Sequence, residues 1–217
     1  MINAIIDLSH NNANPDFKQI AGAGILGVFH KASQGAGYAD PTYAARRAAA
    51  KAAGLLWGAY HFGTGEDPEA QAKKFLSVTG TPADELLVLD FEPDTTPGQT
   101  TMSLAQAEAF VQYIQKATNR WPGVYSGSLA KQDLGSSTKS PLGNCWFWLS
   151  EYGPKAIVPP LWKDWTFWQY TDGTVNAAPA DAVPGVGKCD RERFNGTADQ
   201  LRAFWQAGGA AAVAAVA

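Results

Sequence analysis

Short runs of β-branched and aromatic residues alternate along this chain with Ala-rich segments whose apolar residues repeat at helical spacing. This alternation limits the possible folds, because strands that alternate with helices indicate βα units around a parallel sheet. The eight predicted strands are Ala4–Leu8, Ile25–Lys31, Leu55–Phe62, Glu85–Glu92, Gly123–Ser126, Cys145–Ser150, Thr166–Tyr170 and Lys188–Arg191.

The helical segments are fewer than the strands. The predicted helices are Pro41–Ala53, Pro68–Val78, Ser103–Asn119 and Thr197–Gln206, with Ser103 as an N-cap that forms a capping box with Gln106. The stretches Leu129–Asn144 and Gly173–Gly187 are rich in Gly, Ser and Pro and are predicted as loops. We therefore expect an α/β fold, an irregular (β/α) TIM-like barrel with eight strands and fewer, partly degenerate helices.

Length and composition indicate one domain. A chain of 217 residues with 46% apolar and 17% charged residues can bury a large core, and no long linker interrupts it. We expect a single catalytic barrel domain at 1–207 and a flexible, apolar C-terminal tail at 208–217. A strand begins at Asn3 without a basic or long apolar leader, so no signal peptide is predicted in this chain.

The charge pattern excludes several classes of partner. A net charge of -3 without a Lys/Arg run provides no positively charged surface that could bind nucleic acid. The apolar tail is about half the length needed to cross a bilayer, so no membrane span is expected there. Cys145 and Cys189 lack the clustered Cys/His spacing of a zinc site, so we expect neither metal nor cofactor. Another strand is predicted to lie between the strands that carry the two cysteines, which puts them too far apart for a disulfide, so we expect free thiols. Eight Trp and seven Tyr suit a protein that packs aromatic faces against sugars. We expect a monomer.

The segment Leu86–Pro93 carries the clearest chemical signal. A nearly continuous apolar run marks a strand buried on both faces, and this run ends in Asp90 and Glu92. Two residues apart, these side chains share one face, roughly 6–7 Å apart at Cα. Such a pair can divide into an ionised carboxylate and a protonated general acid, as glycoside hydrolysis requires. The alternative is a helix cap or an ion pair with a neighbouring cation.

Polar and aromatic residues also mark the ends of other predicted strands. Each has a structural explanation when taken alone, as a loop cap, a core aromatic or a hydrogen-bonded histidine. In a parallel barrel, however, the carboxyl ends of the strands form one reaction face. We therefore expect the following residues around one rim with Asp90 and Glu92: Asp7, His61, Tyr125, Trp168, Gln169, Tyr170 and Asp190.

Seven motifs in order give the chain a specific resemblance between about Ile5 and Gly196. They are Ile-Asp-Leu-Ser at 6–9, His-Lys-Ala-Ser-Gln-Gly at 30–35, Gly-Ala-Tyr-His-Phe at 58–62, Leu-Asp-Phe-Glu at 89–92, Val-Tyr-Ser at 124–126, Trp-Gln-Tyr-Thr at 168–171, and Asp190 with Phe194-Asn195-Gly196. In these motifs the chain resembles the family 25 glycoside hydrolases, the Chalaropsis-type lysozymes. The resemblance implies a substrate, bacterial peptidoglycan, and cleavage between N-acetylmuramic acid and N-acetylglucosamine.

The resemblance also implies roles for individual residues. Glu92 is expected to be the general acid, and Asp90 to orient the substrate's own acetamido group as it attacks the anomeric carbon, with net retention. Asp7 and Asp190 are expected to line the same pocket and to raise the pKa of Glu92. The implied sugar-contacting residues are Tyr60, His61, Tyr125, Trp168, Gln169 and Tyr170. An enzyme with this substrate acts on the cell wall, as a phage endolysin released from the cytoplasm or as an exported protein.

Two departures from the family pattern leave details of sugar recognition open. Gln34 stands where relatives often carry an acid, and residues 189–194 read Cys-Asp-Arg-Glu-Arg-Phe in place of the more usual Val-Asp-Leu-Asn-Arg-Phe. We expect Arg191 and Glu192 to form an ion pair. Two other functions are compatible with the sequence: a catalytically inactive sugar-binding barrel, against which both acids count, and a chitinase-like hydrolase, whose longer acidic strand motif is missing.

Overall fold

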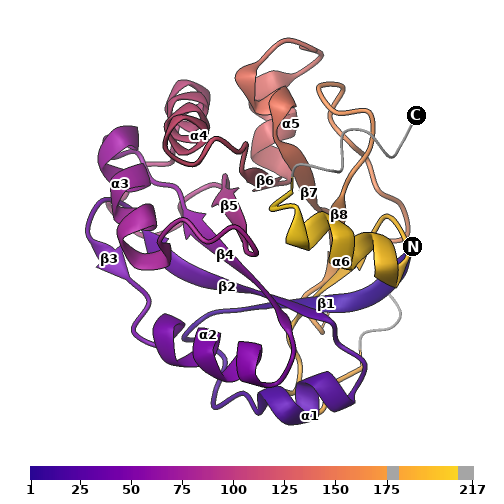
Figure 1. Cartoon of the computed structure of the whole chain (residues 1–217). Helices are drawn as coiled ribbons and strands as arrows, with labels where there is room; N and C mark the ends of the chain where they lie inside the picture. The colour runs from indigo at the N-terminus through magenta and orange to yellow at the C-terminus, as the bar shows by residue number, and fades with distance from the viewer. Residues whose placement is uncertain (175–180, 210–217) are drawn as a thin grey trace.

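The computed structural model describes residues 1–174 and 181–209, and within them nine strands form one sheet (Figure 1). The order is β1-β9-β8-β7-β6-β5-β4-β2-β3, and an additional pairing between β1 and β2 closes eight of the strands into a barrel. The ninth, β3 (Tyr38–Ala39), is a two-residue strand paired with the end of β2. The barrel confirms the predicted fold class.

The eight predicted barrel strands are all present, seven of them with shifted ends and Gly123–Ser126 with the predicted ones. They are β1 (Ile2–Leu8), β2 (Gly27–Gln34), β4 (Leu56–Phe62), β5 (Leu86–Asp90), β6 (Gly123–Ser126), β7 (Trp146–Ser150), β8 (Phe167–Thr171) and β9 (Asp190–Phe194). The last strand starts and ends later than predicted, and it runs antiparallel to both β1 and β8. The barrel is therefore mixed, and the first residue of β9 lies at the rim where the parallel strands end.

Helices α1 to α5 lie around the outside of the barrel (Figure 1). The helices are α1 (Phe17–Gly22), α2 (Tyr43–Ala52), α3 (Pro68–Thr79), α4 (Leu104–Thr118), α5 (Ser128–Leu134) and α6 (Ala198–Gln206). The predicted capping box of Ser103 and Gln106 is present at the start of α4. Two predictions were wrong: α1 was not predicted, and the expected loop at 129–144 contains α5 and a 3-10 turn, Pro141–Asn144.

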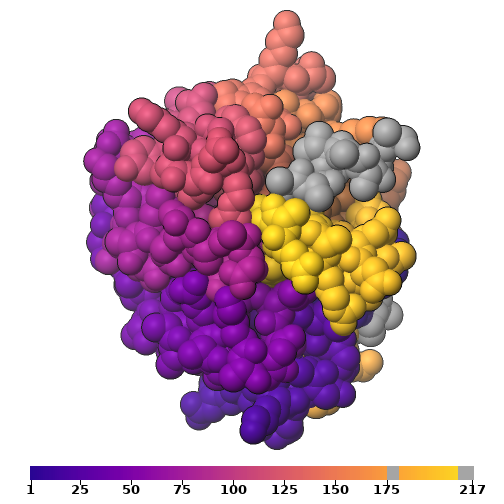
Figure 2. Space-filling view, viewed as in Figure 1, coloured from indigo at the N-terminus to yellow at the C-terminus, as the bar shows by residue number. Residues whose placement is uncertain are grey.

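Aromatic side chains fill the interior of the barrel, and α6 closes its N-terminal end. Phe29 lies between the rings of Trp148 and Trp205, 4.4 and 4.9 Å away. The indole of Trp205 donates a hydrogen bond to the carbonyl of Trp57 at 2.7 Å. Figure 2 shows α6, in yellow, packed over this end of the molecule. In the described part of the chain, the end left open to a ligand is the opposite one, where the parallel strands finish.

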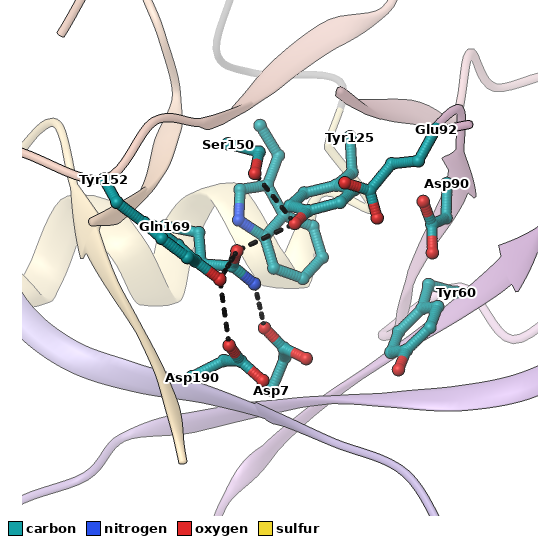
Figure 3. Close-up of a pocket in the computed structure, with 10 residues that line it drawn as sticks. Asp7, Tyr60, Asp90, Glu92, Tyr125, Ser150, Tyr152, Gln169 and Asp190 are labelled. Atoms are coloured by element: carbon teal, nitrogen blue, oxygen red, sulfur yellow. Dashed lines mark hydrogen bonds between the residues drawn. The ribbon is translucent and has the colours of Figure 1, made fainter. Parts of the chain in front are cut away.

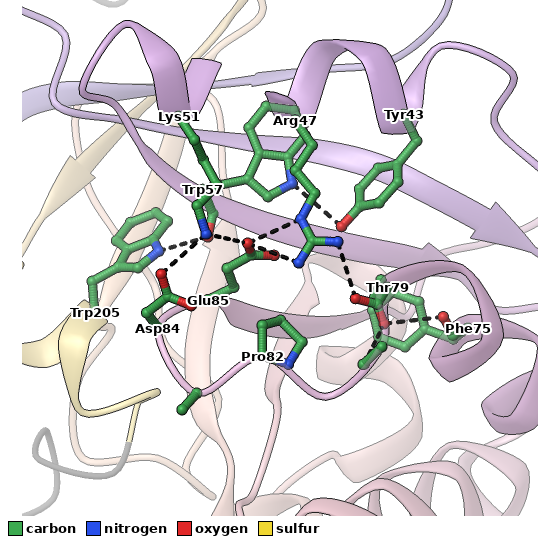
Figure 4. A network of polar contacts seen from close by, with 12 residues as sticks. Tyr43, Arg47, Lys51, Trp57, Phe75, Thr79, Pro82, Asp84, Glu85 and Trp205 are labelled. Atoms are coloured by element: carbon green, nitrogen blue, oxygen red, sulfur yellow. Dashed lines mark hydrogen bonds and ion pairs between the residues drawn. The ribbon is translucent and has the colours of Figure 1, made fainter. Parts of the chain in front are cut away.

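An ion cluster ties α2 to the start of β5 (Figure 4). Glu85 directly precedes β5, and its side chain is fully buried. Its Oε1 accepts hydrogen bonds from Arg47 at 2.9 Å and from Lys51 at 2.7 Å, both in α2. Lys51 also reaches the exposed Asp84 at 3.0 Å. The cluster fixes the strand that carries Asp90 against the surrounding helix layer.

The remaining structural predictions concern the chain end and the cysteines. Gly208 and Gly209 are buried, whereas positions 210–217 of the predicted tail and 175–180 of the predicted loop lie outside the described residues. Cys145 and Cys189 are buried free thiols, as predicted. In the described ranges, no helix combines the length and apolar character needed to span a membrane.

Candidate active site

The open end of the barrel holds a pocket of about 360 Å³ (Figure 3). Its lining combines four carboxyl groups with aromatic, hydroxyl and amide side chains, and comes from seven strands and two loops. The lining residues are Asp7, Tyr60, Asp90, Glu92, Tyr125, Trp148, Ser150, Tyr152, Gln169 and Asp190. Seven of these ten were predicted as site residues from strand ends or family motifs: the central pair Asp90 and Glu92, together with Asp7, Tyr60, Tyr125, Gln169 and Asp190.

Strand alternation explains why three predicted sugar-contacting residues do not line the pocket. His61 points into the helix layer, where its ring hydrogen-bonds with Ser33 at 2.8 Å and Gln71 at 3.2 Å. Trp168 donates to the carbonyl of Glu151 at 2.7 Å, and Tyr170 packs under the guanidinium of Arg193. Successive side chains of a strand face opposite sides. Tyr60 and Gln169 face inward, so their chain neighbours face outward.

Three lining residues were missed by the sequence analysis. Trp148 and Ser150 share the inward face of β7, and Trp148 is in register with Tyr125, its ring 4.7 Å from the tyrosine ring. The same two-residue alternation could have identified both. Tyr152 lies in the loop after β7, where no periodicity applies, and its position follows from the tertiary fold alone.

A chain of hydrogen bonds crosses one wall of the pocket (Figure 3). The hydroxyl groups of Tyr125 and Tyr152 lie 2.7 and 3.1 Å from Oε1 of Gln169. With its oxygen engaged by these hydroxyls, Gln169 donates from Nε2 to Oδ2 of Asp7 at 2.6 Å. The network orients the amide of Gln169 and fixes the carboxylate of Asp7 at the pocket wall.

The predicted Arg191–Glu192 ion pair is wrong, because the two residues are neighbours on a strand and face opposite sides of it. Arg191 donates to the carbonyl of Asp181 at 3.1 Å. Glu192 is fully buried inside the barrel, and neither of its carboxyl oxygens meets a donor from the described residues.

The comparisons with known proteins agree with the motif pattern. The model of the family "Glycosyl hydrolases family 25" matches residues 6–177. The chain belongs to glycosyl hydrolase family 25. Lysozyme M1 of Streptomyces globisporus is 30% identical over 92% of this chain and 70% of its own length. The autolytic lysozyme of Clostridium acetobutylicum is 30% identical, and the match spans about half (53%) of that protein.

Solved structures show the same similarity in three dimensions. The bacterial lysozyme of Streptomyces coelicolor superimposes with a TM-score of 0.81 at 30% identity, covering 94% of this chain and 96% of that one. The family 25 lysozyme of Aspergillus fumigatus gives 0.76 at 30% identity, with 91% and 96% covered. This family 25 protein is therefore a glycoside hydrolase with an irregular α/β barrel.

Burial dominates the electrostatics of the pocket in this family 25 hydrolase. Burial raises the pKa of Asp90 well above its ordinary value, and the neighbouring charge of Glu92 raises it further. Burial also raises the pKa of Glu92. The ammonium group of Lys31 acts in the opposite direction on Asp90. The pair therefore keeps a proton at pH values where two exposed carboxyls would both be ionised.

The acids across the pocket are also perturbed. Burial and the charges of Asp7 and Asp172 raise the pKa of Asp190 to about 8. Burial raises the pKa of Asp7, although hydrogen bonds from Glu192 and Gln169 act to lower it. No group of His, Cys, Asp and Glu side chains suited to holding a metal ion occurs in the part of the chain that the structure describes. The site thus offers acid–base groups and sugar-stacking surfaces.

Proposed function

We propose that this family 25 hydrolase is an N-acetylmuramidase that cleaves the β-1,4 bond between N-acetylmuramic acid and N-acetylglucosamine in bacterial peptidoglycan. The observation that carries the proposal is the pair Asp90 and Glu92, which lines a pocket at the open end of the barrel and retains a proton through burial. Glycoside hydrolysis needs one protonated and one ionised carboxyl at such a place.

Glu92 is the proposed general acid. Its raised pKa favours a protonated side chain that gives its proton to the leaving glycosidic oxygen. Glu92, Ser150 and Tyr152 also line a second hollow of about 290 Å³. The carboxyl of Glu92 therefore borders two hollows, which suits an acid that acts between a sugar on each side of the scissile bond.

Asp90 is the proposed partner of the substrate's acetamido group. One of its carboxyl oxygens is buried and makes no hydrogen bond with the described residues, so it is available to accept the acetamido N–H. This contact would orient the acetamido oxygen toward the anomeric carbon and stabilise the positive charge that forms on the ring. Burial raises the pKa of Asp90, and the ammonium group of Lys31 acts against this rise, which supports the ionised form that this role needs.

The rest of the pocket suits an N-acetylated sugar. The partly exposed ring of Tyr60 offers a face for sugar C–H groups, and the buried rings of Tyr125 and Trp148 add apolar lining beside it. Asp7 and Asp190, on the wall opposite Glu92, can accept hydrogen bonds from sugar hydroxyl or amide groups.

Analysis of the reducing ends distinguishes this function from its alternatives. The enzyme is incubated with purified peptidoglycan and, in parallel, with chitin oligomers, and the fragments are reduced and identified by mass spectrometry. We expect fragments that end in reduced N-acetylmuramic acid and little cleavage of chitin. Comparable cleavage of chitin would favour a chitinase-like hydrolase. Sugar binding without fragments from any wall type would indicate an inactive barrel.

A further inference from the structure

Glu192 is a buried acid behind the pocket that the proposed mechanism does not use. It lies in the middle of β9, in register with Ile5 of β1 and Gln169 of β8, and its side chain is fully buried. Asp190, two residues earlier on the same face, lines the pocket, so Glu192 occupies the layer immediately below it.

The surroundings of Glu192 do not support a charge. Within the described residues, no N–H or O–H donor reaches either carboxyl oxygen. The nearby titratable groups are Asp7 of β1 and Asp190 and Cys189 beside it in the chain. The flanking arginines are directed elsewhere: Arg191 contacts the carbonyl of Asp181, and Arg193 lies over the rings of Trp168 and Tyr170. A buried carboxylate without donors or a counterion loses its hydration without compensation, and such a group takes up a proton instead.

The carboxyl groups of Glu192 and Asp7 lie close enough to share a hydrogen bond. Two carboxyls can share a hydrogen bond only if one of them carries a proton. Asp7 already accepts a hydrogen bond from Nε2 of Gln169 at 2.6 Å, which favours its ionised form. The proton therefore belongs on Glu192.

We propose that Glu192 is a positioning residue that stays protonated at neutral pH and donates a hydrogen bond to the carboxylate of Asp7. Together with Gln169 it holds Asp7 from behind, ionised and fixed toward the sugar. This inference rests on the proposed muramidase function for its kinetic consequences, but the protonation state of Glu192 is independent of that function. Burial, which raises the pKa of Glu192 well above its ordinary value, acts in the same direction.

Infrared spectroscopy tests the protonation state directly. Spectra of the wild type and of Glu192→Gln are compared at neutral pH in H2O and D2O. We expect the difference spectrum to contain the C=O band of a protonated carboxylic acid, shifted in D2O. The matched control is Glu85→Gln, which removes a buried glutamate bound by two cations and should remove carboxylate bands instead. Loss of carboxylate bands alone in Glu192→Gln would overturn the proposal.

Kinetics on peptidoglycan test the positioning role. Glu192→Gln keeps an N–H donor for Asp7, and we expect its kcat within about threefold of the wild type. Glu192→Leu has a similar size but no donor, and we expect kcat to fall roughly tenfold with little change in KM, the cost of one hydrogen bond to a charged group. Equal kcat in the two variants, with Tm values that show both are folded, would overturn the positioning role. If the wild type itself releases no muropeptides, the proposed function fails, and the infrared result still decides the protonation of Glu192.

Discussion

At the scale of single residues, the acidity of Glu92 depends on the charges that share its pocket. Asp7 is one of them, and its negative charge raises the pKa of Glu92. Asp7 lies near the end of β1 and Glu92 lies just after β5, and their carboxyls are on different sides of the pocket (Figure 3). The ionisation of Asp7 therefore helps to keep the proposed acid protonated.

Replacing Asp7 with Asn tests this coupling. Loss of the negative charge makes the ionised form of Glu92 less unfavourable, so its pKa falls and the acid loses its proton at lower pH. We expect the alkaline limb of the kcat/KM profile to move to lower pH, since this limb reports the acid of the free enzyme. Asp16→Asn, at the exposed N-cap of α1, is the control and should leave the limb in place. A limb that stays in place or moves upward in Asp7→Asn would refute the coupling.

The candidate site could be predicted from the sequence as far as residue types and strand ends, but not always as far as side-chain direction. Asp90 and Glu92 were found because a continuous apolar run ends in these two acids, whose two-residue spacing puts them on one face. His61 and Tyr60 were both assigned to the pocket, although neighbours on a strand cannot both face it. Tyr152 could not be found, because the path of a loop depends on packing that no local pattern encodes.

At the scale of elements, the ion cluster around Glu85 connects α2 to the strand that carries Asp90 (Figure 4). The side chain of Glu85 is fully buried, whereas Arg47 and Lys51 are 28% and 40% exposed. Because the two cations can recover part of their hydration when Glu85 is replaced, the loss of unfolding free energy should be smaller than for a fully buried ion pair.

We expect Glu85→Gln to lower the free energy of unfolding by about 1 to 2 kcal/mol, because both cations lose their buried partner. Asp84→Asn, the neighbouring exposed acid that also contacts Lys51, serves as the control and should change it by less than about 0.5 kcal/mol. Urea unfolding measures both values. Equal effects of the two substitutions would show that the cluster does not anchor α2.

The elements themselves were predictable where periodicity and caps are strong. The strands and helices α2, α3, α4 and α6 follow from apolar repeats and capping residues such as Ser103 and Thr197. The antiparallel direction of β9 could not be predicted, since a strand's residue pattern does not encode the direction of its partners. The short helices α1 and α5 have six and seven residues, too few for a periodic signal.

At the scale of the whole molecule, the acidic pocket links enzyme stability to pH. The pKa of Asp190 is raised from 3.8 to about 8 in the folded protein. Between these values the folded state binds a proton that the unfolded state has lost. The contribution of Asp190 to stability is therefore fully present below about pH 4 and is lost as pH rises through about 8.

Asp190→Asn removes this dependence. We expect the unfolding free energy of the variant, relative to the wild type, to increase from pH 5 to about pH 8 and then to level off, because only in the wild type does the folded state bind a proton that the unfolded state has lost, and it loses this proton near pH 8. Urea unfolding at pH 5, 7 and 9 measures the difference. A difference that is constant or decreases with pH would contradict the assignment of a raised pKa to Asp190.

The central claim is that Glu92 supplies the proton for cleavage of peptidoglycan, and the most direct measurement is the rate of reducing-sugar release by Glu92→Gln. Removal of a general acid is expected to lower this rate by about a hundredfold or more, without loss of folding or of sugar binding. Glu69→Gln, an exposed acid on α3, is the matched control and should retain the wild-type rate. A rate in Glu92→Gln within a few-fold of the wild type would contradict the account.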